Sequence, residues 1–392
     1  MVELRRIYLE ESAEIIYLKA DAIIQGEKQS LWYATARENK DYISTSNADA
    51  FILFIFIYCV FENLEFKSNV PISKRLKFGL VEVLLPIFQE MGFKTTKEMF
   101  DLKLEDETKY PEASAIGTAM SFGVDSFFSY IKGRESINKI NYLTLFNAGA
   151  FGQYGGEKAL GLFEAMKLKV IDFASQNKLG FVWVNTNLNE VFKMPFVQTH
   201  TFRNFACVLV FQKLFKGYYY ASGINIKNFK LNKLDPAYYD LINAKAIAAN
   251  SLELYISGLT ENRIEKTRAI SDNEVTFRNL NVCLITPDNK NLNSENNAPN
   301  CSKCFKCART MVTLDILGKL DNFSDVFDLK VFNKNKFKYL AELKYKQYRS
   351  NDVLAKEIFN EAKTKGYNIP IKVYYYTVLR IFQPIIRKIN NA

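Results

Sequence analysis

The sequence has a single histidine, His200, among its 392 residues. Chemistry that depends on paired histidines is therefore excluded. A long apolar run is also missing, because the longest one, residues 50–61, has twelve residues, whereas a membrane-spanning helix needs about 20. The opening residues, MVELRR, are followed by mixed polar residues and not by the apolar stretch of a secretion signal. We expect a cytoplasmic protein without a transmembrane segment, in which residues 50–61 belong to a buried helix.

Cysteine is scarce, and most of it is clustered. Two of the six cysteines, Cys59 and Cys207, lie in apolar stretches and are predicted to be small buried residues. The other four form a single cysteine followed by C-x2-C-x2-C, which can close a tetrahedral thiolate shell around Zn²⁺: Cys283, Cys301, Cys304 and Cys307. A reduced cysteine cluster and an iron–sulfur cluster are the alternatives. Lys303, Lys306 and Arg309 would partly offset the thiolate charge.

Positive charge is concentrated at the C-terminal end. The net charge is +10, and residues 331–392 alone hold thirteen Lys and Arg against four Asp and Glu. This pattern fits a solvated helical face. It also fits a surface for RNA, a phosphorylated substrate, an acidic membrane or a protein partner.

Composition and periodicity divide the chain into four regions. Residues 1–112 mix strand and helix signals. Residues 113–270 alternate strands and helices, which predicts an α/β fold with a doubly wound parallel sheet and helices on both faces. Residues 271–330 carry the cysteines, and residues 331–392 form a basic helical extension. In open parallel sheets the ligand lies beyond the carboxyl ends of the strands.

Individual elements follow from the same patterns. Strands are predicted at residues 30–34, 115–121, 142–146, 180–184, 218–221 and 282–285. Helices are predicted at residues 48–62, 74–91, 155–177, 201–215, 334–365 and 369–389, the last interrupted at Pro384, and a further helix near residue 127. Residues 287–300 are rich in Asn and Pro and are predicted to be a loop.

One turn carries the strongest functional signal. In AMSFGVDS, residues 119–126, a strand ends near Ser121 and a helix starts near Asp125. Backbone N–H groups at a helix N-terminus bind anions, and Gly123 allows a close approach to the backbone. Asp125 can cap the helix or hold a magnesium ion. An ordinary strand–turn–helix with a Ser/Asp cap is the alternative.

This turn resembles the SGGxDS signature of the PP-loop ATP pyrophosphatase superfamily. The resemblance implies that ATP and Mg²⁺ bind at Ser121, Phe122, Gly123, Val124, Asp125 and Ser126. Phe122 is a departure, because that family usually has glycine there. The turn and the cysteines are about 175 residues apart, so we expect them in separate cores, with ATP binding surviving the loss of zinc.

Further motifs over residues 113–315 resemble 7-cyano-7-deazaguanine synthases, whose fold is adenine nucleotide alpha hydrolase-like. The matching features are the pair Arg203-Asn204 before an apolar helix, Gly223 after the next strand, and Lys266 before the cysteines. The resemblance implies catalytic Asp125, Arg203 and Lys266, and nucleotide contacts from Asn147 and Gly223. Arg263 is a further candidate for stabilising phosphate charge. A surface ion pair is the alternative for each cation, and His200 is expected to cap or pack.

The reaction implied by the resemblance is ATP-dependent adenylation. A carboxylate or amide of a small-molecule substrate takes AMP, and ammonia from a donor displaces it. Residues 1–112 and 320–392 have no counterpart in a minimal synthase, so its substrate is not transferred to this chain. Two alternatives remain: a nucleic-acid modification or anti-phage defence component, and a non-catalytic nucleotide-binding scaffold in which Phe122 blocks the phosphate pocket.

Overall fold

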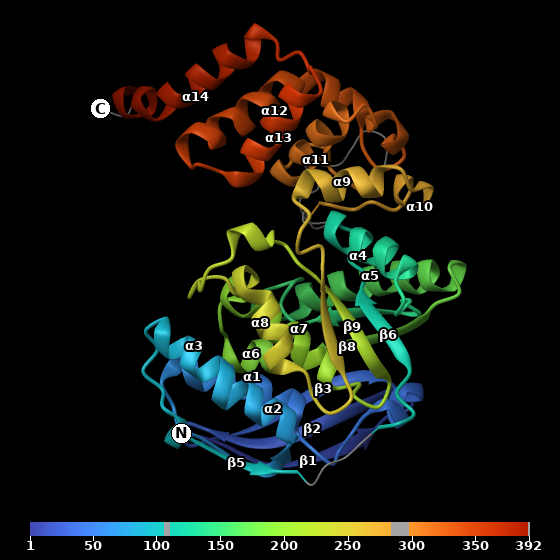
Figure 1. Cartoon of the computed structure of the whole chain (residues 1–392), viewed down its shortest axis with the longest axis vertical. Helices are drawn as coiled ribbons and strands as arrows, with labels where there is room; N and C mark the ends of the chain where they lie inside the picture. Colours follow the sequence, from blue (N-terminus) through green and yellow to red (C-terminus); the bar gives the residue numbers. More distant parts are fainter. Residues whose placement is uncertain (106–109, 284–297, 391–392) are drawn as a thin grey trace. The chain divides into compact units, whose positions relative to one another are not determined.

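The computed structural model describes residues 1–105, 110–283 and 298–390. The chain divides into two compact units (Figure 1). Unit 1 comprises Met1–Met120 and Ser129–Leu259, and unit 2 comprises Ser121–Phe128 and Thr260–Ala392. The division runs through helix α4 (Val124–Glu135), whose first turn belongs to unit 2.

Unit 1 is built on one ten-stranded sheet with the strand order β10-β9-β6-β7-β8-β3-β2-β1-β4-β5. Its strands are β1 (Val2–Glu11), β2 (Ile15–Ile24), β3 (Glu27–Ala36), β4 (Phe66–Ile72), β5 (Phe100–Leu104), β6 (Ala115–Ala119), β7 (Tyr142–Asn147), β8 (Gly180–Thr186), β9 (Phe215–Ala221) and β10 (Glu253–Ser257). The α/β class predicted from the sequence is confirmed.

Five neighbouring strands, β6 to β10, are parallel. The chain runs from β6 through β7 to β8 on one side and then continues with β9 and β10 on the other side of β6. Open α/β sheets bind ligands at such a reversal, beyond the carboxyl ends of the strands. The parallel strands predicted from residue 115 onward are thus present in the sheet.

The remaining strands make the sheet mixed and not purely parallel. β1, β2 and β3 form an antiparallel meander. β4 pairs parallel with β1, and β5 pairs parallel with β4. β3 pairs antiparallel with β8 through Tyr33–Thr186 and Ala34–Asn185. Residues 1–112 and 113–270 thus contribute strands to one sheet, which local patterns could not show because the two partners are far apart in sequence.

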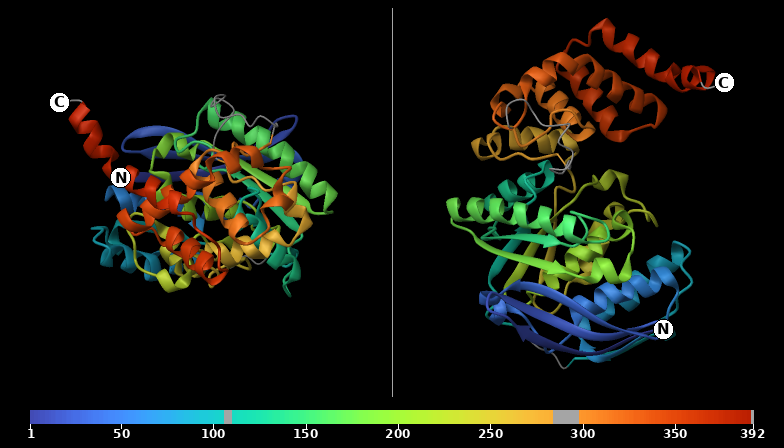
Figure 2. Two further views of the ribbon diagram at one scale, coloured as in Figure 1. Left: turned by 90° about the horizontal axis from the view of Figure 1, so that it is seen from above. Right: turned by 180° about the vertical axis from the view of Figure 1, so that it is seen from behind.

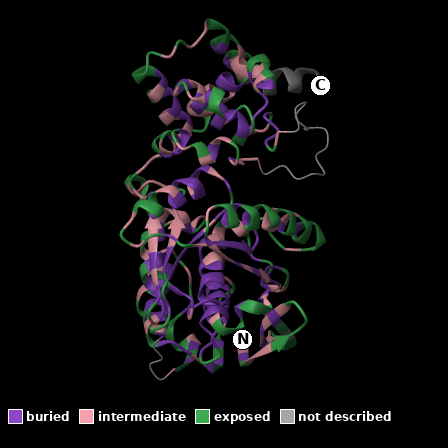
Figure 3. Cartoon of the chain, turned by 90° about the vertical axis from the view of Figure 1, so that its right-hand side faces the viewer, coloured by how far each residue is buried: buried purple, intermediate pink, exposed green. Residues whose placement is uncertain are grey.

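The core of unit 1 contains a helix that is apolar on every side. Helix α1 (Asp49–Glu62) is buried from Asp49 to Val60, as a central helix must be when it lacks a polar face. It ends at Asn63, whose φ of 54° is the left-handed conformation common after a helix. Cys59 and Cys207 are buried in the same core, as predicted. Figure 3 shows the buried residues concentrated inside this unit.

The other helical elements of unit 1 surround this core. They are η1 (Arg37–Tyr42), α2 (Lys74–Phe78), the π-helix η2 (Gly79–Leu84), α3 (Leu85–Glu90), η3 (Lys97–Met99), α5 (Glu157–Gln176), α6 (Leu188–Phe192), α7 (Phe196–Leu209), η4 (Ile226–Asn228), η5 (Pro236–Tyr239) and α8 (Asp240–Ile247). Helix α7 begins five residues and ends six residues earlier than the predicted helix at 201–215, and its first residues, FVQTH, are too polar to show the apolar periodicity.

The described residues of unit 2 are helical apart from the turn at residues 121–123 and the segments that connect the helices (Figure 2). Its helical elements are α9 (Arg263–Ser271), α10 (Glu274–Phe277), α11 (Phe305–Ile316), η7 (Leu320–Phe323), α12 (Leu329–Arg349), α13 (Val353–Thr364) and α14 (Ile371–Asn390). Within the described residues, no helix combines the length and the apolar character needed to cross a membrane.

Three predictions in unit 2 need comment. The helix predicted at residues 334–365 is two helices, because the Asp352 side chain accepts a hydrogen bond from the Ala355 N–H and starts α13. Helix α14 continues through Pro384, where an interruption was predicted, since a proline can be accommodated with the loss of one backbone hydrogen bond. The predicted strand at 282–285 and loop at 287–300 lie largely outside the described residues.

Candidate phosphate site and four-cysteine centre

The turn at residues 121–123 has an unusual backbone. Phe122 has φ 59°, a left-handed conformation that large side chains rarely adopt and that clusters at functional sites. Its ring is 3% exposed and packs 5.9 Å from the ring of Phe127, centroid to centroid. Its carbonyl oxygen accepts a hydrogen bond of 2.8 Å from the Asn281 N–H. The phenyl ring is therefore turned inward, and the backbone has the conformation that a glycine would favour.

The start of α4 presents unused donors. The Ser126 hydroxyl donates to the Gly123 carbonyl at 3.0 Å, and the exposed Ser121 hydroxyl donates to the Ser126 oxygen at 3.2 Å. Among the described residues, no acceptor faces the backbone N–H groups of residues 123–126. Such groups at a helix N-terminus, together with hydroxyl donors, suit an anion.

Two cations from α9 flank the carboxylate of Asp125. The guanidinium of Arg263 lies 2.8 Å from its Oδ2, and the ammonium of Lys266 lies 3.6 Å from its Oδ1. The two cations are three positions apart on one helix, so they face the same side. Lys266 is 3% exposed. Burial lowers its pKa, and the negative charge of Asp125 opposes that shift.

Helix α11 adds two more cations to the same surroundings. Burial and the nearby positive charge of Arg263 lower the pKa of Arg309 to about 10. Desolvation, Arg309 and Arg263 also lower the pKa of Lys306, while Asp125 raises it. Lys306 and Arg309 thus interact electrostatically with Asp125 and Arg263, while Arg263 and Lys266 contact Asp125 directly. Lys306 and Arg309 were predicted only to offset the thiolate charge of the cysteines, because their distance in sequence from Asp125 gave no sign of this interaction.

Acidic side chains balance part of this charge. Asp352 and Glu357 act electrostatically on Arg309 together with Asp125. Burial raises the pKa of Glu357, and one of its carboxylate oxygens is buried without a hydrogen-bond partner. The region therefore combines cations with several carboxyl groups, and burial biases one of these, Glu357, towards the neutral form.

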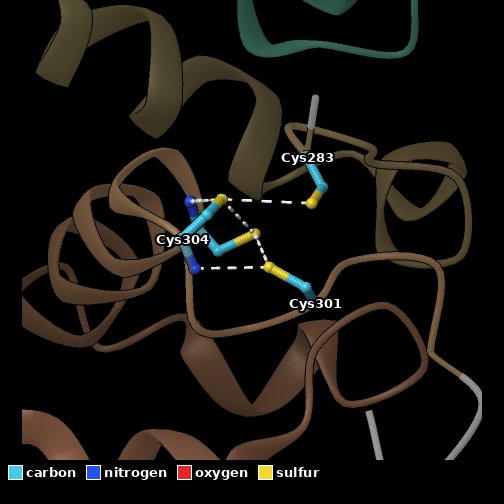
Figure 4. A group of neighbouring side chains, drawn as sticks. Cys283, Cys301 and Cys304 are labelled. Atoms are coloured by element: carbon cyan, nitrogen blue, oxygen red, sulfur yellow. Dashed lines mark hydrogen bonds between the residues drawn. The ribbon is translucent and has the colours of Figure 1, made fainter. Parts of the chain in front are cut away.

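The four predicted cysteines converge on one point, as Figure 4 shows for the three that it labels. Their sulfur atoms all lie within 4.8 Å of one another. The separations are 3.9 Å for Cys283–Cys304, 3.8 Å for Cys301–Cys307 and 3.4 Å for Cys304–Cys307. A tetrahedral zinc ion with Zn–S bonds of about 2.3 Å requires sulfur separations of about 3.8 Å. The cluster can therefore hold a metal such as zinc.

Local backbone geometry prepares these sulfurs. The Cys304 N–H points at the Cys301 sulfur at 3.2 Å, and the Cys307 N–H at the Cys304 sulfur at 3.4 Å, so that Cys304 caps the start of α11. The fully buried Asn300 accepts hydrogen bonds from the N–H groups of Val282 and Cys283. This amide ties the separate cysteine to the C-x2-C-x2-C segment, a positioning role that no sequence motif announced.

The structure changes one expectation about these two sites. Ser121–Phe128 belongs to unit 2, the same compact unit as the cysteines. The expectation of separate cores was wrong, because distance along the chain was used as a measure of distance in the fold. Helix α11 links the sites directly: it begins after Cys304 and carries both Lys306 and Arg309.

The other candidate cation, Arg203, lies in unit 1 and is 1% exposed. Its guanidinium donates to the Thr199 hydroxyl at 2.8 Å, the Asn189 side chain at 2.7 Å and the Gln153 carbonyl at 3.1 Å, and also to the Met194 carbonyl. Arg203 therefore holds together the segments that follow β7 and β8.

Three further candidates also belong to unit 1. Asn147 ends β7, is 5% exposed and donates to Asn185 at 2.8 Å, while its own side-chain oxygen is buried without a partner. A Cβ added to Gly223 would meet no atom within 4 Å, so crowding does not explain this glycine. His200 lies between the Tyr220 hydroxyl at 3.1 Å and Asp235 at 3.2 Å. The histidine is thus hydrogen-bonded on both ring nitrogens.

Comparisons with known proteins do not assign a function to this chain. No protein-family model, curated protein or solved structure matches the chain. The fold and the site define an α/β protein with a ten-stranded, mostly parallel sheet and a four-cysteine group that could bind a metal.

Proposed function

We propose that this chain is an ATP-dependent, AMP-forming enzyme that adenylates a carboxylate or amide and transfers nitrogen to it. The observation that carries the proposal is the position of Asp125, at the start of α4 and paired with both Arg263 and Lys266. A turn after a parallel strand, free N–H groups and converging cations form a site for the phosphates of a nucleotide. The strand order β8-β7-β6-β9-β10 also suits a doubly wound nucleotide-binding fold.

Charge explains how the site would accept pyrophosphate. Asp125 is the anion that the two α9 cations contact at present. The phosphates of ATP are stronger anions and would share Arg263 and Lys266, with Lys306 and Arg309 supplying further positive charge. Asp125 would then be available to help hold Mg²⁺ through its carboxylate oxygens. Pyrophosphate gains negative charge as it leaves, and the four cations stabilise that charge.

The proposed chemistry has two balanced steps. A carboxylate or amide oxygen of the substrate attacks the α-phosphorus of ATP, and the bond to the β-phosphate breaks, which releases pyrophosphate and leaves an acyl adenylate or its imidate equivalent. Ammonia then attacks the activated carbon, AMP departs with the bonding electron pair, and the nitrogen loses a proton. Within this scheme Arg203 stays a predicted catalytic residue, and its hydrogen bonds favour a positioning role.

Zinc fits a structural role in this proposal. Four cysteine sulfurs complete a tetrahedral shell and leave no open position for a substrate. The site would therefore hold α11, and with it Lys306 and Arg309, in place.

ATP–pyrophosphate exchange and AMP release, measured with panels of carboxylic acids and amides, test the proposal. Lys266→Met should abolish both signals, because it removes a buried positive charge beside the phosphate turn. Arg268→Ala is the matched control on the same helix, since Arg268 pairs instead with Glu361 at 2.7 Å. ATP binding without AMP formation under any substrate condition would contradict the proposal.

A nucleic-acid modification or defence role is the second candidate, and the positive charge of residues 331–392 favours it. If the substrate is carried by tRNA, binding should weaken steeply as salt rises, because phosphate contacts release counterions. Absence of salt-sensitive RNA binding at low ionic strength would exclude this candidate. A non-catalytic scaffold in which Phe122 blocks the phosphate pocket is the remaining alternative, and micromolar binding of ATP and magnesium by calorimetry would exclude such a blocked pocket.

A further inference from the structure

The last helix of unit 2, α14, is attached along one side only. It packs on α12, where the hydroxyl of the buried Thr377 lies 3.5 Å from the Ala341 carbonyl oxygen, and Val373, one turn earlier, is also buried. Arg380 lies on the same side and pairs with Glu342 of α12 at 3.4 Å. Within unit 2, the C-terminal end of α14 projects beyond the other helices (Figures 1 and 2).

The opposite side of α14 is apolar and exposed. At about 100° per residue, Ile371, Tyr375, Val378 and Phe382 fall on the side away from Val373. Their exposed fractions range from 48% to 84%, and the exposed Leu379 and Ile381 flank them. Single exposed apolar residues are ordinary, but a continuous apolar surface marks a site of interaction.

Positive charge borders this apolar surface. The exposed Lys372 falls about 100° from Val373, at the margin of this surface, and residues 371–382 contain no acidic residue. On α12, the ammonium of Lys344 lies 5.2 Å from the ring centroid of Tyr348 and 5.9 Å from that of Tyr374. Both tyrosines are exposed. Aromatic, aliphatic and cationic side chains are therefore combined on one surface.

This combination selects among possible occupants. A second copy of α14 would bring the Lys372 and Lys344 side chains of two chains together with no acidic residue on residues 371–382 to pair with them, and like charges repel. RNA would engage the cations and tyrosines, but the aliphatic side chains of Ile371, Val378 and Ile381 would gain nothing from stacking or phosphate contact. An anionic lipid surface accommodates both, because apolar side chains enter the acyl boundary while lysines and arginines meet the headgroups.

We propose that α14 docks this protein on an anionic membrane surface. The helix lies in the plane of the interface, with Ile371, Tyr375, Val378 and Phe382 inserted and the tyrosine hydroxyls at headgroup level. Lys372 and Lys344 supply attraction to acidic lipids, and the side that contacts α12, Arg380 included, stays with the protein. The enzyme would then act at a membrane surface without spanning it.

Co-sedimentation of the full chain with lipid vesicles tests this proposal. We expect binding to phosphatidylcholine vesicles that contain phosphatidylserine, weak binding to pure phosphatidylcholine, and weaker binding at high salt. The double variant Tyr375→Ser with Phe382→Ser should lower the partition coefficient by about tenfold or more. The matched control is Leu168→Ser with Ile171→Ser, which changes two exposed apolar residues of α5 in unit 1 and should leave binding unchanged.

Circular dichroism and metal content would verify that both double variants are folded. The proposal is overturned if the protein does not bind acidic vesicles, or if the α14 substitutions do not weaken that binding. A concentration-dependent dimer in solution that these substitutions abolish would also overturn it. RNA binding that depends on Tyr375 and Phe382, without vesicle binding, would equally assign the surface to another occupant.

Discussion

The carboxylate of Asp125 and the guanidinium of Arg263 are 2.8 Å apart, although one begins helix α4 and the other begins helix α9. Each helix therefore brings its first turn to the same place. The positive end of two helix dipoles and two cationic side chains surround a single carboxylate. This excess of positive potential is the physical basis of the predictions for the phosphate site.

Replacing Asp125 with Asn should abolish AMP formation. The variant keeps the shape of the side chain but loses the charge that pairs with Arg263 and Lys266. We expect a stability loss of about 1–3 kcal/mol, between the values for exposed and buried ion pairs. Pyrophosphate should then raise the melting temperature more in the variant than in the original protein, because it replaces the missing anion. AMP formation at the original rate would show that the carboxylate has no part in the reaction.

Replacing Phe122 with Gly should leave ATP affinity nearly unchanged. The ring is packed against Phe127 and is not a plug in front of the exposed Ser121. Glycine relieves the left-handed backbone but removes a buried ring, so a net destabilisation of about 2–4 kcal/mol is expected. Calorimetry with ATP and magnesium decides the matter, and a large gain in affinity would mean that the ring blocks the pocket.

Loss of zinc should affect the phosphate site as well as the cysteine site. Elemental analysis should find about one zinc per chain, and Cys304→Ser should lower that content. Because Cys304 caps α11, the substitution should also displace Lys306 and Arg309 and weaken ATP binding. Cys59→Ser is a useful control, since this buried cysteine lies in unit 1. If elemental analysis finds iron with acid-labile sulfide, the cysteines hold an iron–sulfur cluster and not zinc. Unchanged ATP affinity in a zinc-free variant would refute the coupling between the cysteine site and the phosphate site.

The pH dependence of stability should contain a contribution from Asp49. Burial raises the pKa of this fully buried carboxyl group to about 7 from an ordinary value near 3.8. The folded state thus holds a proton that the unfolded state releases between these values, so stability falls as pH rises from about 4 to about 7. Asp49→Asn should remove up to about 4 kcal/mol of this decline. Denaturant unfolding at several pH values measures it, and identical profiles for both proteins would contradict the assignment.

Local motifs revealed the parts of the site that are close together in sequence. Cys301, Cys304 and Cys307 are placed by one short turn, so their spacing was enough to predict their convergence. Asp125 and Ser126 likewise follow from a strand, a turn and a helix start. Arg309 could not be recognised as a neighbour of Asp125, because that proximity depends on how α11 packs. The burial of Arg203 was hidden for the same reason: residues from several loops supply its hydrogen-bond acceptors.

The same limit applies to the sheet. Alternating strands and helices predict parallel strands from residue 115 onward, since each helix returns the chain in the same direction. The antiparallel pairing of Tyr33 with Thr186 joins the edge strand of the β1–β3 meander, β3, to the edge strand of the parallel part, β8. No residue near Tyr33 carries information about that partner.

The pairing of β3 with β8 has a consequence for the newly made chain. On the ribosome, at about 5–20 residues per second, roughly 8–30 seconds separate the synthesis of Tyr33 from that of Thr186. During this interval β3 has a free edge, which can pair with strands of other chains. A fragment that stops before β8 would keep that edge permanently. Such fragments should therefore aggregate during expression, and a chaperone that shields strand edges should increase the yield of the complete chain.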